Sequence, residues 1–219
     1  LLSDAQLAER IRTLAPRPVE VCFHMNEMKK HPNTLKLHAF DAEDGLLETM
    51  TVYSVGGGVI EIEGEDAAVH APCYPHHTLD EIKAFCAAEH IGLNAYVDQF
   101  DDSDISGYLN EILIQMLKTV DAGLNASGIL PGRLKLERIA RSLLQEASDV
   151  HGSEREKLLL CAYAYAACEE NASGGMSVTA PTLGSSGLLP ALLYYYYYDL
   201  KYQRETLVEG LKVAGLIGN

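Results

Sequence analysis

Basic residues are scarce in this sequence. Seventeen lysines and arginines stand against thirty-one aspartates and glutamates, which gives a formal net charge of −14 over 219 residues. A surface with this balance repels the phosphates of nucleic acids and the head groups of anionic lipids. We therefore expect neither nucleic acid nor a membrane as a partner.

Long apolar runs are also absent. The most hydrophobic stretch, Gly187 to Leu193, passes directly into five tyrosines and Asp199, so it is too short for the roughly twenty apolar residues of a membrane-spanning helix. The first residues, Leu1 to Asp4, include no initiator methionine and no basic segment followed by an apolar one. No signal peptide is expected, and the chain is expected to begin inside a longer polypeptide.

Cysteine is too sparse and too irregular to form a framework. The five cysteines include no Cys-x-x-Cys pair and no even set, so neither a zinc module nor a secreted disulfide scaffold is indicated, and no metal site is predicted from spacing. A reducing, cytoplasmic setting is the simplest expectation.

Apolar residues make up 47% of the chain, enough for one large domain or two small ones. The first 70 residues predict an α+β domain: a helix over about residues 4–14, then strands of alternating apolar residues with turns between them. The strand candidates are Val19–Phe23, Leu35–Ala39, Met50–Tyr53 and Val59–Ile62. Gly56–Gly58 lacks the spacing of a dinucleotide site and indicates a bulge or a close domain contact.

Beyond residue 70 the apolar period changes from two to between three and four, which predicts an all-α helical domain over residues 71–219. Capping-box sequences begin helices at Thr78 and Ser153. The expected helices cover residues 78–90, 105–120, 134–147, 154–170 and 205–216. The helix over 154–170 is apolar nearly all round, so it should be central.

One loop combines small residues with a following helix. Thr182 to Gly187 leads into Pro190, which suits a first helical turn. Its N–H groups and hydroxyls could bind a carboxylate or phosphate, although such residues also form ordinary loops between helices. Asn171 and the Glu169–Glu170 pair either line the same pocket or cap the preceding helix.

Histidine and tyrosine supply the remaining polar candidates. His31-Pro32-Asn33 has turn chemistry, and only its imidazole is not required by the turn and is available for proton transfer. Tyr194 to Tyr198 point in all directions around a helix and favour packing. His76 and His77 have no partner at metal-ligand spacing and favour structural roles.

Seven segments in this order resemble the iron-sulfur L-serine dehydratases, bacterial enzymes that deaminate serine. They are His31-Pro32-Asn33, Phe40–Ala42, Tyr53–Gly58, Gly128–Lys135, Glu169–Gly175, Thr179–Gly187 and Gly215–Asn219. The resemblance implies an L-serine dehydratase that converts L-serine to pyruvate and ammonia by α,β-elimination of water, with a small-molecule amino acid substrate and a homodimeric, cytoplasmic protein.

The resemblance also implies a substrate site and a cofactor. The expected substrate-binding residues are His31, Asn33, Asn171, Thr182, Gly184, Ser185 and Ser186, and no catalytic residue is assigned. A [4Fe-4S] cluster is expected for the family. This sequence has Leu183 and Ser186 where a cysteine ligand is expected, and neither is a usual ligand of such clusters. The alternative is a cluster-free homologue that binds an amino acid or a partner chain without catalysis.

Overall fold

A computed structural model describes residues 8–9, 11–13, 19–24, 30–56, 59–65, 73–101, 104–178 and 187–218. These residues form two compact units, a sheet unit up to residue 65 and a helical unit from residue 73. The predicted fold class, an α+β domain followed by helices, is confirmed. The boundary predicted near residue 70 lies outside the described residues.

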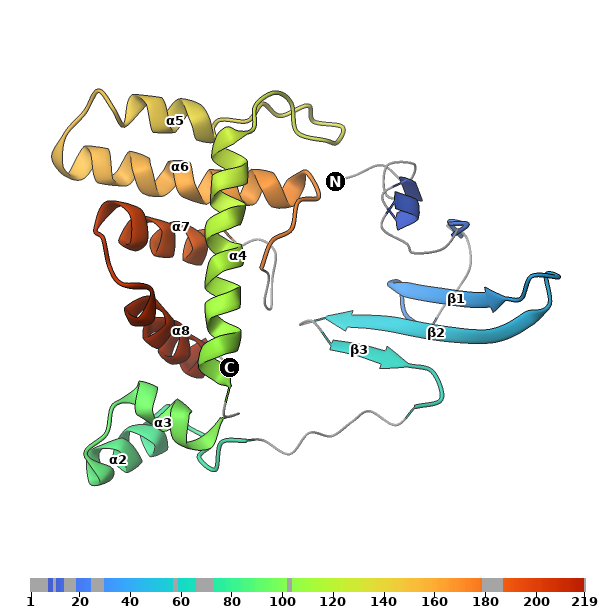
Figure 1. The fold of residues 1–219 in the computed structure, drawn as a ribbon, viewed down its shortest axis with the longest axis horizontal. Helices are drawn as coiled ribbons and strands as arrows, with labels where there is room; N and C mark the ends of the chain where they lie inside the picture. Colours follow the sequence, from blue (N-terminus) through green and yellow to red (C-terminus); the bar gives the residue numbers. More distant parts are fainter. Residues whose placement is uncertain are drawn as a thin grey trace. The chain divides into compact units, whose positions relative to one another are not determined.

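The sheet unit contains three antiparallel strands in the order β1-β2-β3 (Figure 1). The strands are β1 (Thr34–Phe40), β2 (Leu46–Gly56) and β3 (Val59–Ile62). Each lies at a predicted strand, although β2 extends well beyond the predicted Met50–Tyr53. Register shifts occur in both pairings, and one of them, between Ser54 and Gly56, is the irregularity predicted beside the triple glycine. The described residues of the predicted first helix, 8–9 and 11–13, are helical.

The strand predicted at Val19–Phe23 is wrong. Residues 19–24 adopt no regular secondary structure, and Val19 and Phe23 are 38% and 42% exposed. Alternation alone stabilises no strand, because the stabilising contacts are those with a paired neighbour and a buried face.

In the helical unit, α4 (Ile105–Asn125) crosses a layer formed by α5 (Ala140–Glu146), α6 (Gly152–Ala172) and α7 (Leu188–Tyr194) (Figure 1). The predicted central helix, α6, packs against α4, α5 and α7. After α7 come a π-helical turn, η1 (Tyr195–Asp199), and α8 (Arg204–Gly218). The main core consists of buried side chains of these helices, among them Leu113, Val120, Ala162 and Ala166.

A second, smaller core joins α2 (Leu79–Glu89) and α3 (Leu93–Phe100) to the end of α8. Lys212 of α8 is almost fully buried, and its Nζ lies 2.7 Å from carboxylate oxygens of Asp98 and Glu209. Burial disfavours a charged ammonium, but hydrogen bonds to these two carboxylates raise the Lys212 pKa overall. The paired charge therefore fixes α3 against α8.

Two predicted helix starts are wrong. The expected helix over 134–147 begins only at Ala140, because the Pro131-Gly132 turn folds Ile129 back to form a β-bridge with Glu137. The capping box expected at Ser153 does not form, because the helix already begins at Gly152 after an extended His151. The Thr78 box does form, with both reciprocal hydrogen bonds to Glu81.

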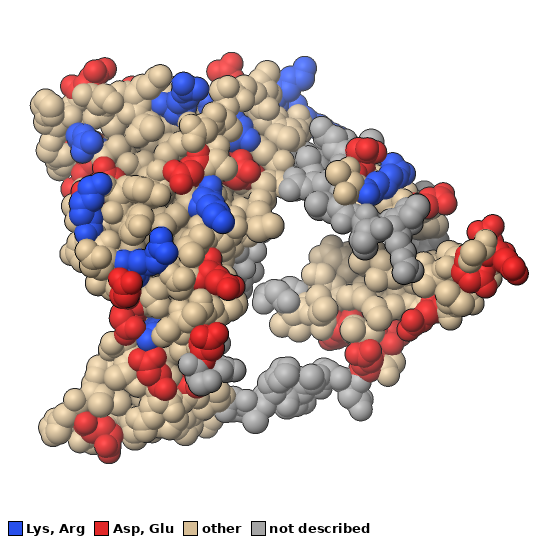
Figure 2. Space-filling view, in the orientation of Figure 1, with Lys and Arg blue, Asp and Glu red and all other residues tan. Residues whose placement is uncertain are grey.

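Charge is unevenly distributed over the visible surface. On the face drawn in Figure 2, basic side chains of the described residues lie mainly on the helical unit, where acidic groups are interspersed with them. Acidic side chains are also prominent on the sheet unit in this view. None of the helices in the described part of the chain is both long and apolar enough to cross a lipid bilayer.

Close contact between α4 and α6 depends on one glycine. A Cβ added at Gly123 would lie 2.1 Å from the carbonyl oxygen of Ala166. We predict that Gly123→Ala lowers the free energy of unfolding by about 1–3 kcal/mol, because the helix backbones must move apart. Gly210→Ala, where nothing lies within 4 Å, is the control and should stabilise by roughly 0.5–1 kcal/mol. Urea unfolding followed by circular dichroism measures both, and equal effects would contradict the close-contact argument.

Candidate functional site

Several buried polar residues of the helical unit lie close to the end of α6. The helix gives way to a turn at Ser173 and Gly174, and the chain then runs extended to Val178. The Ser173 N–H donates to the carbonyl of Glu169 at 3.0 Å, and the Gly175 N–H donates to that of Glu170 at 2.9 Å. These bonds satisfy carbonyls at the end of the helix, so the turn is a structured C-terminal cap.

A buried carboxylate links this helix end to the start of α5. Oε1 of Glu169 accepts hydrogen bonds from the backbone N–H groups of Ile139 at 2.7 Å and Ala140 at 3.3 Å. It therefore caps the first turn of α5, which has no side-chain cap of its own. The Glu169 side chain is only 4% exposed.

Arg138 is the counter-ion of this carboxylate. Its side chain is 9% exposed, and Nη1 lies 4.0 Å from Oε2 of Glu169, an ion pair without a direct hydrogen bond. The other terminal nitrogen, Nη2, donates to the hydroxyl of Ser173. Arg138 Nη1, Glu169 Oε2 and the Ser177 hydroxyl are buried without a hydrogen-bond partner among the described residues.

The chain after this turn is held by α4. The Thr119 hydroxyl lies 2.8 Å from the carbonyl oxygens of both Met176 and Gln115, and the Gln115 amide donates to Met176 O at 3.1 Å. Thr119 is 2% exposed. The segment that leads into residues 179–186 is therefore fixed on α4.

Gly187, at the far end of this loop, packs closely against α6. A Cβ at Gly187 would lie 2.5 Å from Cys168 Sγ and 2.6 Å from the carbonyl oxygen of Ala164, so a side chain does not fit there. Pro190 lies in the first turn of α7, as predicted. Both ends of the small-residue loop thus start from well-packed positions in one helical unit.

The predicted substrate-binding residues fall into three groups. Asn171 lies in the last turn of α6 and is half-buried. His31 and Asn33 belong to the sheet unit, so their meeting with Asn171 in one cleft stays a prediction. The other predicted residues lie outside the described residues: Thr182, Gly184, Ser185 and Ser186.

The His31 turn has a defined hydrogen-bond pattern. The backbone N–H of Asn33 donates to Nδ1 of His31 at 3.1 Å, and the Ser54 N–H of β2 donates to the carbonyl of Asn33 at 3.0 Å. Because Nδ1 accepts, the neutral ring carries its proton on Nε2. The preceding Lys30 lies 4.8 Å above the ring of Tyr53 and pairs with Glu61 at 3.5 Å, which anchors the turn to the sheet.

The described donors do not fit a metal cluster. No group of three or more His, Cys, Asp or Glu residues that could hold a metal ion occurs in the described ranges. All five cysteines are free. Cys168 packs beside Gly187, but burial raises the pKa of its thiol, which disfavours the thiolate that iron binds. Leu183 and Ser186, where the family resemblance places a cysteine, lie outside the described residues.

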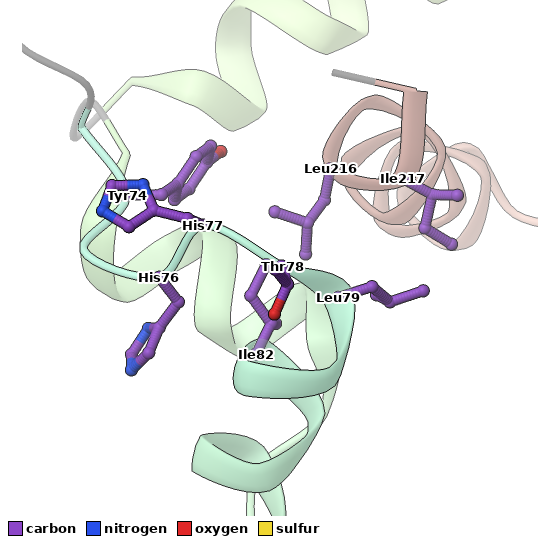
Figure 3. Close-up of a pocket in the computed structure, with 8 residues that line it drawn as sticks. All are labelled: Tyr74, His76, His77, Thr78, Leu79, Ile82, Leu216 and Ile217. Atoms are coloured by element: carbon purple, nitrogen blue, oxygen red, sulfur yellow. The ribbon is translucent and has the colours of Figure 1, made fainter.

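A cavity of about 160 Å³ lies elsewhere, between the start of α2 and the end of α8 (Figure 3). Tyr74, His76 and His77 line it together with aliphatic side chains that include Leu216. Nδ1 of His76 lies 2.8 Å from the hydroxyl of Tyr96, and its ring packs against Phe85 with centroids 4.9 Å apart. His76 thus has the structural role that the sequence predicts, and none of the predicted substrate-binding residues lines this cavity.

Sequence reasoning missed Arg138, Thr119 and Gln115. Arg138 was expected inside a helix, and the other two carry no motif because their role is a contact with a carbonyl 57 and 61 residues away. The packing role predicted for the tyrosines holds for Tyr194, which is buried and whose hydroxyl donates to Asp121 at 2.6 Å, whereas Tyr196 and Tyr198 are exposed.

Comparison with known proteins gives a consistent result. The family described as serine dehydratase alpha chain matches residues 21–219. L-serine dehydratase 1 of Escherichia coli is 33% identical over 93% of this chain and 48% of its own length. L-serine dehydratases of Streptomyces coelicolor and Haemophilus influenzae are 37% and 31% identical, over 86% and 90% of this chain. The chain thus spans about half the length of these relatives.

The contact between α4 and Met176 is directly testable. We predict that Thr119→Val lowers the free energy of unfolding by about 1–3 kcal/mol, because the buried hydroxyl that bonds the Met176 carbonyl is lost while the side-chain shape is kept. Thr206→Val on the exposed side of α8 is the matched control and should change stability by less than about 0.5 kcal/mol. Urea unfolding compares the two, and equal small effects would show that the Thr119 hydroxyl does not hold the segment.

Proposed function

The chain belongs to the serine dehydratase alpha chain family, as its motifs predict, and we propose that the protein containing it is an L-serine dehydratase. The proposed reaction removes water from L-serine and releases pyruvate and ammonia after hydrolysis of the resulting enamine. The observation that carries the proposal is the match over residues 21–219, together with relatives that are themselves named L-serine dehydratases.

Elimination of water from serine needs two things from a protein. The weakly acidic α-proton must be removed, and charge must be stabilised on the departing oxygen, because hydroxide is a poor leaving group. The free substrate also carries a carboxylate and an ammonium group that must be bound in a fixed orientation. The described residues are best suited to this binding role.

The residues that we propose for carboxylate binding are those that the family resemblance implies. His31 is suited to donate through Nε2–H, because its Nδ1 accepts from the Asn33 amide. Asn171 offers a half-buried side-chain amide in the last turn of α6. Asn33, Thr182, Gly184, Ser185 and Ser186 complete the proposed set. Because Nδ1 already accepts, His31 is better suited as a hydrogen-bond donor than as the base that removes the α-proton.

The [4Fe-4S] cluster implied by the family would need ligands that the described residues do not provide. An open iron would act as a Lewis acid in such enzymes. We also propose a cytoplasmic homodimer, which the resemblance implies. The five free cysteines favour only the cytoplasmic setting, because free thiols persist in a reducing compartment. The second candidate function is a cluster-free homologue that binds an amino acid or a partner chain, favoured by the poor donor set and by Leu183 and Ser186.

We predict that the 219-residue chain alone releases no pyruvate from L-serine. Binding groups that hold substrate and transition state equally do not lower the chemical barrier, and the described residues provide no metal-ion electrophile for the leaving oxygen. The full-length protein, reconstituted anaerobically with iron and sulfide, should form pyruvate in the same assay. Absence of cluster absorbance and of pyruvate there would overturn the enzyme proposal, and calorimetric binding of L-serine without iron would then support the second candidate.

Substitution of His31 in the full-length protein distinguishes a role in substrate binding from a role in proton transfer. His31→Ala should raise KM for L-serine about tenfold, the effect of losing roughly 1.4 kcal/mol of binding, whereas His31→Gln keeps an N–H donor and most of the affinity. His38→Ala, an exposed histidine of β1, is the control. A large fall in kcat at unchanged KM would instead assign His31 to proton transfer.

A further inference from the structure

We propose that Arg138 and Glu169 are positioning residues that hold the end of α6 in the geometry that substrate binding requires. This inference rests on the proposed function, since its target is Asn171 and the turn that follows it. Neither residue is assigned a contact with substrate. Both are charged, nearly fully buried, and located where three segments of the helical unit meet.

Glu169 holds the end of α6 against the start of α5. Its carboxylate lies in the last turn of α6, where the helix dipole disfavours negative charge. It is retained there by the N–H groups of Ile139 and Ala140, at 2.7 and 3.3 Å. Because these donors belong to α5, the end of α6 cannot move without uncapping α5.

Arg138 holds the turn that follows α6. Its guanidinium bonds the Ser173 hydroxyl, and that hydroxyl also donates to the carbonyl of Glu169 at 2.8 Å. The turn containing Ser173, Gly174 and Gly175 is therefore held by backbone hydrogen bonds and also by hydrogen bonds of the Ser173 side chain. Asn171 lies between Glu169 and Ser173 in sequence, so fixing these two neighbours fixes the backbone from which its side chain projects.

Burial of the Arg138–Glu169 pair is not explained by a gain in folding stability. Two buried charges contribute little net stability on average, because desolvation offsets their attraction. Here the pair is also imperfect, since the 4.0 Å separation leaves Arg138 Nη1 and Glu169 Oε2 without a hydrogen bond among the described residues. A pair kept in this form is better explained by fixed geometry than by stability alone.

The test compares Arg138→Met, Arg138→Lys and a control, Arg141→Met, in the full-length protein. Arg141 is an exposed residue of α5, one turn away from Arg138. Arg138→Met should raise KM for L-serine at least tenfold with kcat changed less than threefold, and Arg138→Lys should restore part of the affinity. Arg141→Met should match the wild type.

Hydrogen exchange provides a readout that needs no activity. In Arg138→Met, amides in the peptide over residues 171–178 should exchange at least tenfold faster, while the α4 peptide over residues 113–120 stays unchanged. Equal acceleration of both peptides would reveal general destabilisation and overturn the positioning role, as would an unchanged 171–178 peptide. Faster local exchange at unchanged KM would overturn the link to substrate.

The two proposals fail in different ways. If the wild type forms no pyruvate, the proposed function is overturned, and exchange together with calorimetric binding of L-serine decides the positioning role. If the wild type is active and Arg138→Met keeps both its KM and its local exchange rate, only the positioning role is overturned.

Discussion

The helical unit depends on one buried carboxylate. Glu169 lies at the negative end of its own helix and out of water, two conditions that each disfavour its charge. The compensation comes from the first N–H groups of α5 and from Arg138. This single side chain therefore caps the start of α5 and links it to the last turn of α6.

A second set of contacts extends this constraint to the small-residue loop. Thr119 and Gln115 hold the Met176 carbonyl on α4, and Gly187 fits against α6 only because it lacks a side chain. Both stems of the loop thus rest on the two longest helices, whose own contact is closed by Gly123. A loop that binds a small anion benefits from such fixed stems, because less conformational freedom is lost on binding.

Sequence predicted the elements better than their ends. The change from period two to a helical period correctly indicated a sheet followed by helices, and the Thr78 capping box fixed the start of α2. The start of α5 could not be predicted in this way, because its cap is supplied by Glu169 from 30 residues further along the chain. Local sequence contains propensities and side-chain caps, whereas a cap from another helix exists only after the fold has formed.

The contrast between local sequence signals and contacts made only in the fold also applies to the candidate site. Asn171 and His31 could be selected because they stand in motifs, and the structure adds the hydrogen bond that sets the ring proton of His31. Arg138 could not be selected, because a buried charge is recognised by what surrounds it and not by its spacing. Its neighbours Ser173 and Glu169 are both motif residues. The motif Glu169–Gly175 therefore contains a buried side chain that caps α5 and, two residues later, the half-buried Asn171 that we propose as a substrate-binding residue.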